Sequence, residues 1–353
     1  MTTIDNSTIR NRRQIGIWLL ICCALIFAMV VLGGVTRLTG SGLSMVEWKP
    51  VYGVLPPMNQ TDWEDLYEKY SKTPEAQKIN IGMGLEGFKG IFWLEYLHRI
   101  LGRLIGVVFL LPFLFFLLMR RVDKPLMPKL VTMFVLGGLQ GGLGWLMVKS
   151  GLVDNPHVSQ YRLTAHLMLA VLIYGYILWV ALGLLAAGTV TRTINSLGNL
   201  KLLTYCFLGL VALTLTSGGF VAGLKAGLAY NTFPLMDGRW VPEGLFNLQP
   251  WPMNLFANMA TVQFNHRVLA ILVFVGAVIL WLVARRYRLT TGLNAGMHVL
   301  LLVALVQVGL GISTLLLHVP VPLAAAHQAG ALVVFTVVVF LAQRLQRIEV
   351  YAT

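Results

Sequence analysis

Apolar residues occur along most of this chain in long runs that polar segments separate. Eight runs have roughly the 20 residues that a helix needs to cross the hydrocarbon core of a bilayer. They fall near residues 15–35, 95–119, 130–148, 163–187, 201–222, 261–284, 295–317 and 323–343. Arginines precede the first run as in a signal peptide, but its length and the lack of a clear cleavage site favour a retained helix. The pattern predicts an all-α integral membrane protein with eight transmembrane helices.

Composition and charge agree with this class of protein. Hydrophobic residues make up 57% of the 353 residues and charged residues only 12%, and the net charge is +13. If the N-terminus is inside, the inner segments carry fourteen Lys and Arg against three acids, whereas the outer segments carry ten of each. Positive charge accumulates on the cytoplasmic side of membrane proteins, so we expect both termini to be cytoplasmic. The same asymmetry explains the charge without nucleic-acid binding. The lack of an Arg- and Ser-rich leader favours a bacterial plasma membrane over an organelle.

Three segments of the first half recur, in order, in the second half. Residues 33–43 resemble 218–228, His98-Arg99 resembles His266-Arg267, and 140–144 resemble 307–311. Each half contains an even number of spans, so both copies have the same orientation in the membrane. We therefore predict two tandem four-helix bundles, residues 1–200 and 201–353, related by a pseudo-twofold axis along the membrane normal.

One histidine occurs near the outer end of each even-numbered span. His98, His166, His266 and His327 are each expected within about two turns of that end, and therefore at one depth near the outer face. Two imidazoles from different helices of a bundle can supply both axial ligands of a haem iron. A hydrogen bond to a neighbouring helix explains a single such histidine equally well. A zinc or copper site is the competing metal interpretation, but it usually needs three or four clustered ligands.

Arginine and glycine residues surround these histidines. Arg99 and Arg267 each follow a candidate ligand, where a guanidinium could bind a haem propionate, although snorkelling to the interface is the simpler alternative. Glycines that could let a flat macrocycle approach the backbone, or alternatively allow close helix packing, are Gly33, Gly34, Gly137, Gly138, Gly141, Gly142, Gly144, Gly218, Gly219, Gly309 and Gly311.

The two halves differ one turn before the first histidine of each. Glu95 precedes His98 by three residues, whereas the corresponding residue of the second half is the neutral Gln263. A carboxyl group in an apolar helix is costly and is a functional candidate by default. The alternative is an ion pair with Arg99 at i,i+4. The asymmetry suggests that one half performs chemistry and the other carries electrons.

The chain resembles the haem A synthase family over nearly its whole length. The resemblance rests on residues 95–99 (EYLHR), 164–167 (TAHL), 264–267 (FNHR) and 326–328 (AHQ). The outer stretches 45–57, with Trp63, Tyr70 and Pro74-Glu75 after it, and 231–238 resemble the branch found in alphaproteobacteria and mitochondria. Some family members carry a cysteine pair in the first outer loop, but residues 36–94 contain no cysteine.

The resemblance implies an oxidoreductase that converts the C8 methyl group of haem O to a formyl group by successive hydroxylations, giving haem A for cytochrome oxidase. It implies that His266 and His327 bind haem b as cofactor. It also implies that His98 and His166 bracket the substrate haem O, with Glu95 beside the reacting methyl. Haem O synthase is the expected partner besides the lipid bilayer, the electron-transfer partner is unknown, and a homo-oligomer is left open.

Two other functions are consistent with parts of the pattern. A dihaem b-type cytochrome that only transfers electrons would use the same four histidines, but it would not need Glu95. A haem-free transporter built from parallel repeats would place broken helices near the midplane. Of the remaining histidines, His318 is the reserve ligand if His327 fails, whereas His157 and His298 are expected to have surface roles.

Overall fold

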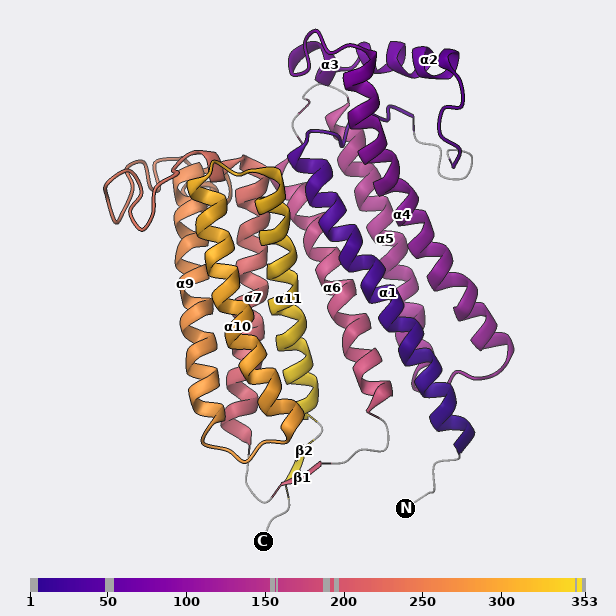
Figure 1. The fold of residues 1–353 in the computed structure, drawn as a ribbon, viewed down its shortest axis with the longest axis vertical. Coiled ribbons are helices and arrows are strands. Elements are labelled where there is room, and N and C mark those ends of the chain that lie inside the picture. Colours follow the sequence, from indigo (N-terminus) through magenta and orange to yellow (C-terminus); the bar gives the residue numbers. More distant parts are fainter. Residues whose placement is uncertain are drawn as a thin grey trace.

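Eight long helices run side by side through the molecule (Figure 1). The computed structural model describes residues 6–47, 54–152, 156, 158–186, 191–193, 197–346 and 348–350. The long helices are α1 (Asn6–Leu38), α4 (Leu85–Leu118), α5 (Met127–Gly151), α6 (Gln160–Leu185), α7 (Gly198–Leu224), α9 (Met259–Ala284), α10 (Thr291–Leu316) and α11 (Val321–Gln346). Each coincides with one predicted run, and within the described ranges these eight are the helices long and apolar enough to span a membrane.

The remaining elements are short. They are α2 (Gln60–Ser71), α3 (Pro74–Lys78), the 3-10 turns η1 (Ala226–Leu228) and η2 (Trp251–Met253), α8 (Asn254–Ala257), and the strands β1 (Thr191–Thr193) and β2 (Ile348–Val350). The strands form a parallel pair in which Thr191 lies opposite Ile348. The predicted all-α class is therefore confirmed, apart from this small ladder.

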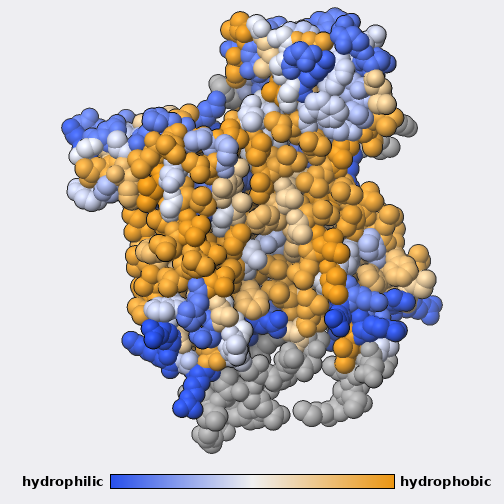
Figure 2. All heavy atoms as spheres, viewed as in Figure 1, coloured by the Kyte–Doolittle hydropathy of each residue, from blue (hydrophilic) through white to orange (hydrophobic). Residues whose placement is uncertain are grey.

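The surface matches a protein that crosses a bilayer. Figure 2 shows a broad hydrophobic band between hydrophilic ends. Large apolar side chains such as Leu111 and Leu302 are about three-fifths exposed on the helices. Helices satisfy their own backbone hydrogen bonds, so they can present such side chains to lipid. The chain is a multi-pass membrane protein in which the start of α1 and the end of α11 lie at the end of the bundle opposite α2 and α3 (Figure 1).

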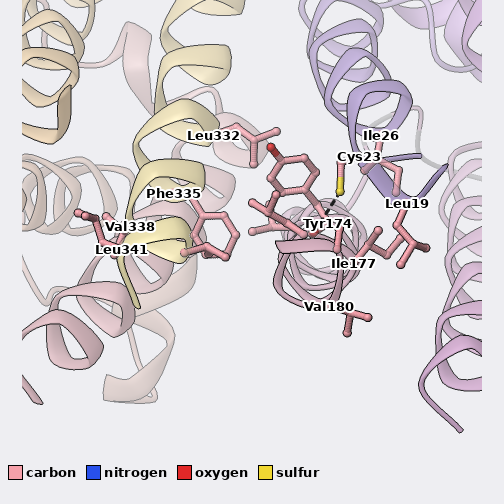
Figure 3. Close-up of a cluster of buried hydrophobic side chains, with 14 of the residues drawn as sticks. Leu19, Cys23, Ile26, Tyr174, Ile177, Val180, Leu332, Phe335, Val338 and Leu341 are labelled. Carbon is pink, nitrogen blue, oxygen red and sulfur yellow. Dashed lines mark hydrogen bonds between the residues drawn. The ribbon is translucent and has the colours of Figure 1, made fainter. Parts of the chain in front are cut away.

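Helices of the first and second halves meet in a packed apolar core. Tyr174 of α6 lies between α1 and α11 (Figure 3), and its hydroxyl forms a 2.7 Å hydrogen bond with that of Thr336. The ring of Phe335 packs directly against Gly175, where a Cβ would lie 2.9 Å from it. Hydrogen bonds between membrane helices contribute about 0.6 kcal/mol each, so close packing through such small residues carries most of the association.

Residues 54–84, called the outer segment here because the charge pattern predicts that they lie outside the membrane, cover the N-terminal end of α4. Tyr70 of α2 stacks on Phe88 with ring centroids 5.0 Å apart, and Trp63 packs on Phe92 at the same separation. These contacts explain why α4 begins at Leu85, ten residues before the predicted run. His98 consequently lies in the fourth turn of its helix, and the expectation that it lies within two turns of the helix end is wrong. The other three candidate histidines lie six or seven residues from their helix starts, as predicted.

Candidate functional site

Each of the four candidate histidines lies with its ring against a glycine of a neighbouring helix. The pairs are Gly33 with His98, Gly144 with His166, Gly218 with His266, and Gly311 with His327. A Cβ atom added to these glycines would lie only 2.8 to 3.1 Å from the imidazole Cε1 atom. Any larger residue would therefore displace the ring. Four of the predicted glycines thus lie against the histidines. In each half, the glycine segments that the sequence repeat matched therefore contact the helices that carry the histidines.

The two histidines of the second half face each other. The ring centroids of His266 and His327 are 6.5 Å apart and their planes are nearly perpendicular, at 88°. Metal–imidazole bonds of about 2 Å on opposite sides of one ion place two such rings roughly 6 Å apart. Both rings project from within long helices, α9 and α11, and Gly218 and Gly311 let the neighbouring helices approach the rings closely. The arrangement therefore fits two axial ligands of a single iron.

The first half presents a similar pair. His98 of α4 packs against Gly33, and His166 of α6 packs against Gly144. Their Nδ1 atoms are buried without a hydrogen-bond partner. Buried polar atoms in native proteins nearly always have partners, so unpaired ring nitrogens indicate a site with a further function. Two imidazoles with unpaired nitrogens are a donor set that also fits a haem iron.

A glutamine supports the second histidine of each half. Gln140 of α5 donates through Nε2 to the backbone oxygen of His166 at 3.1 Å, and Gln307 of α10 donates to that of His327 at 2.9 Å. Gln307 also lies 3.1 Å from Nδ1 of His327. These contacts fix the helix that carries each ring, and the sequence repeat contained both glutamines without assigning them this role.

The two arginines bind outer-loop carbonyl groups. Arg99 donates to the backbone oxygens of Met45 and Glu47 at 2.8 and 3.1 Å. Arg267 donates to those of Tyr230 and Thr232, both at 2.9 Å. Each arginine therefore fastens the loop that follows the first helix of its half, a role that the sequence interpretation missed. Nε of Arg267 is buried without a partner and could still serve another acceptor.

Glu95 is buried and fully engaged. Its Oε2 accepts hydrogen bonds from the Ser44 hydroxyl at 2.7 Å and the Met45 amide at 2.8 Å, and its Oε1 pairs with Arg99. The predicted i,i+4 ion pair is therefore present. In the second half the Gln263 side chain donates to the Tyr230 oxygen at 3.0 Å instead. Glu95 and Gln263 each bind the loop that follows the first helix of their own half, but only Glu95 provides a carboxylate.

The other predicted residues are less well placed. His318 is exposed in the turn after α10. His298 is exposed, donates from Nδ1 to the Asn294 backbone oxygen and packs on Trp281, in agreement with a surface role. His157 lies outside the described residues. Gly34 and Gly219 contact Gln328 and Thr164 on helices of the opposite half. The remaining five glycines have no side chain within contact distance; they are Gly137, Gly138, Gly141, Gly142 and Gly309.

A zinc or copper cluster finds no support in the described part of the chain. Groups of three or more His, Cys, Asp or Glu side chains that could hold such an ion do not occur among those residues. Cys22 and Cys23 are buried in the apolar core and Cys206 is exposed, and all three are free thiols. Among the described residues, the paired histidines are therefore the candidate metal-binding feature.

The sequence analysis did not recognise a buried carboxyl group in the outer segment. Glu75 of α3 is 5% exposed, and Tyr70 of α2 is 1% exposed. The sequence Thr73-Pro74-Glu75 does predict the start of a helix here, because a threonine cap followed by proline at the first helical position is typical of a helix start. The Thr73 side chain indeed accepts a hydrogen bond from the Ala76 amide.

Comparison with known proteins places this arrangement in a family. A sequence model described as a cytochrome oxidase assembly protein matches residues 16–339. The chain belongs to this family. A member from Nitrosospira multiformis named heme A synthase is 56% identical over 95% of this chain and 94% of the relative. Another of that name, from Nitrosomonas eutropha, is 51% identical over 98% of this chain and 97% of the relative. One from Paramagnetospirillum magneticum is 53% identical over 95% of this chain and 96% of its own. The matched residues 16–339 therefore include all four histidines and Glu95.

Proposed function

We propose that the protein is a haem A synthase that oxidises the C8 methyl group of haem O to a formyl group by successive hydroxylations. The observation that carries this function is the coincidence of two paired-histidine sites with one carboxylate, in a chain about half identical to members named for that activity. The first hydroxylation gives an alcohol, and the second gives a gem-diol that loses water to form the aldehyde.

The second half is proposed to hold the resident haem b between His266 and His327. The ring separation of 6.5 Å and the glycine contacts of both rings support this assignment. Bound there, haem b would accept electrons and pass them on. The free Nε–H of Arg267 could donate to a propionate near this site. The main task of Arg267 is then to hold the loop around Tyr230 over the site.

The first half is proposed to hold the substrate haem O between His98 and His166. Their unpaired buried nitrogens and their contacts with Gly33 and Gly144 support a planar ligand there. Arg99 would orient the substrate by fixing the loop at Met45, with a propionate as a further acceptor. Glu95 would lie beside the methyl group, where its carboxylate could accept a proton or stabilise positive charge at the methyl carbon.

We further propose that residues 1–200 and 201–353 form two bundles related by a pseudo-twofold axis along the membrane normal. Equivalent contacts support this symmetry. Arg99 and Arg267 bind carbonyls at positions that the repeat aligns, 45 with 230 and 47 with 232. The charge pattern supports cytoplasmic termini in a bacterial plasma membrane, which puts both haem sites near the outer face. Haem O synthase is the proposed supplier of the substrate.

The test is to purify the protein from cells that also make haem O and to identify its extracted pigments by chromatography. We expect haem A and haem B from the wild type. We expect haem O or the alcohol to accumulate in Glu95→Ala, because the site still binds substrate but lacks its carboxylate. Haem B alone, unchanged by Glu95→Ala, would instead establish a dihaem b-type cytochrome that only transfers electrons.

A further inference from the structure

A second carboxyl group is buried outside the membrane-spanning region, in the segment that covers the substrate half. Glu75 of α3 is 5% exposed, although carboxyl groups are rarely buried without a cation. Its side-chain partner is the Tyr70 hydroxyl, which donates to Oε2 at 3.5 Å, and no Lys or Arg pairs with it among the described residues. A group buried at this cost is a candidate for proton transfer.

Tyr70 and Asn80 hold this carboxyl group in place. The Asn80 amide donates to the Tyr70 hydroxyl oxygen at 2.7 Å, which leaves the tyrosine proton directed to Glu75. Tyr70 itself is fixed by stacking on Phe88. The chain Asn80, Tyr70, Glu75 is therefore ordered by packing and hydrogen bonds rather than by ion pairs.

Glu95 lies beside the same cluster, because Met45, whose amide donates to Glu95, packs against the apolar cluster that contains Tyr70. Burial and, second, the negative charge of Glu95 raise the pKa of Glu75 from 4.5 to about 7. The other titratable groups facing it are Tyr70, whose own pKa burial raises to about 12, and Tyr67 behind Tyr70. Glu75 can therefore exchange a proton near neutral pH, whereas Tyr70 stays protonated.

A partly open hollow connects this cluster with the outside. It has a volume of about 260 Å³ and is lined by Tyr70, Asn80 and Ala76, the residue next to Glu75. Polar cavities of this size hold several water molecules. In the second half the residue equivalent to Glu95 is Gln263, which donates to the Tyr230 oxygen and provides no carboxylate.

We propose that Glu75 accepts the proton that leaves Glu95 during methyl oxidation and releases it to water in the hollow, with Tyr70 and Asn80 as positioning residues. The proton leaves the Glu95 carboxyl group, binds a Glu75 oxygen and then passes to water, and no electrons move along this route. The proposal rests on the proposed function, since that reaction generates the protons.

The first test measures haem O oxidation by the full-length protein between about pH 5 and pH 9. Glu75 must be deprotonated to accept a proton, so the wild-type rate should rise as pH passes through about 7. Glu75→Gln should lower the rate roughly tenfold and abolish the rise, and Glu75→Asp should restore it in part. Glu64→Gln, which changes an exposed acid of α2, is the matched control and should behave as the wild type.

A Glu75→Gln enzyme with the wild-type rate and pH profile would overturn the proposal, as would a lowered rate with an unchanged profile, which indicates a structural role. The second test needs no turnover. Infrared spectra of the wild type should contain a protonated-carboxyl band that disappears near pH 7 and is absent from Glu75→Gln, and the lack of such a band would also overturn the proposal. A wild type that makes no haem A but retains this band would overturn the proposed function while leaving Glu75 as a proton-binding group.

Discussion

The two halves of the molecule build the same scaffold around different chemistry. Each half contains two histidine rings, and each ring packs against a glycine of a neighbouring helix. Each half also has an arginine that donates hydrogen bonds to carbonyl groups of the loop after its first helix. The two halves differ in what touches that loop beside the arginine, which is Glu95 in one half and Gln263 in the other. Under the proposed function, the shared contacts would serve to bind a haem, and the carboxylate found in one half alone would serve to oxidise it.

The outer coverings differ as well. In the first half the outer segment folds into α2 and α3 and packs an aromatic cluster on α4, with Glu75 buried inside it. In the second half, the loop before α9 exposes large aromatic side chains, including Trp240 and Trp251. The asymmetric covering lies over the half that carries Glu95, as expected if only that half must handle protons.

The largest effect is expected from Glu95→Gln, which gives the first half the residue of the second. Gln263 occupies the equivalent position of the second half, where an amide side chain is accommodated, so we expect the fold to persist. Loss of a general base or charge stabiliser should lower haem O oxidation by about 10² to 10⁴-fold. The rate of haem A formation checks this, with Gln263→Glu as the reciprocal variant, expected to keep near-wild-type activity. Equal losses in both variants would mean that the asymmetry has no catalytic role.

Filling the glycine contacts should separate the two sites. Gly311→Val places side-chain atoms where the His327 ring lies, and overpacking of this kind costs about 1–3 kcal/mol. Resident haem should be lost, which the absorbance per chain measures. Gly144→Val should spare that haem and weaken substrate binding through His166. Gly292→Ala, at an exposed position with open space near the start of α10, should change neither, and equal haem loss in all three would argue against the ring contacts.

A smaller effect is expected from Arg267→Ala. The variant loses the hydrogen bonds to the Tyr230 and Thr232 carbonyls and the buried Nε–H. Charged hydrogen bonds of this type stabilise by about 1.5–3 kcal/mol, part of which water recovers, so resident haem should dissociate roughly tenfold faster. Transfer of haem to excess apomyoglobin measures that rate. Arg239→Ala, which removes an exposed ion pair with Glu243, should leave the rate unchanged.

The smallest effect concerns the stability of the outer segment with pH. Because the pKa of Glu75 is raised in the folded state, its contribution is complete below its unfolded pKa of about 4.5 and is lost as pH rises through about 7. Amides of α2 and α3 should therefore be better protected from hydrogen exchange at about pH 5 than at about pH 8, after correction for intrinsic rates. Glu75→Gln should remove the difference, and the loop before α9 should not show it.

Most of the architecture could be predicted from the sequence because hydropathy reports lipid-facing length directly. The eight spans and the four histidine sites follow from residue type and from the repeat of His98-Arg99 in His266-Arg267. The start of α4 could not be found in this way, since Glu86 and Lys89 interrupt the apolar run where the helix packs on α2 rather than on lipid. The burial of Glu75 and the loop contacts of Arg99 depend on which segments fold over one another, and this information is not local in the sequence.

The central claim is that the two histidine pairs bind different haems. The most direct measurement identifies and counts the haems bound to purified His98→Ala and His266→Ala from cells that make haem O. The account predicts that His98→Ala keeps haem B but loses haem O and haem A, whereas His266→Ala loses haem B. Loss of the same pigment from both variants would contradict it.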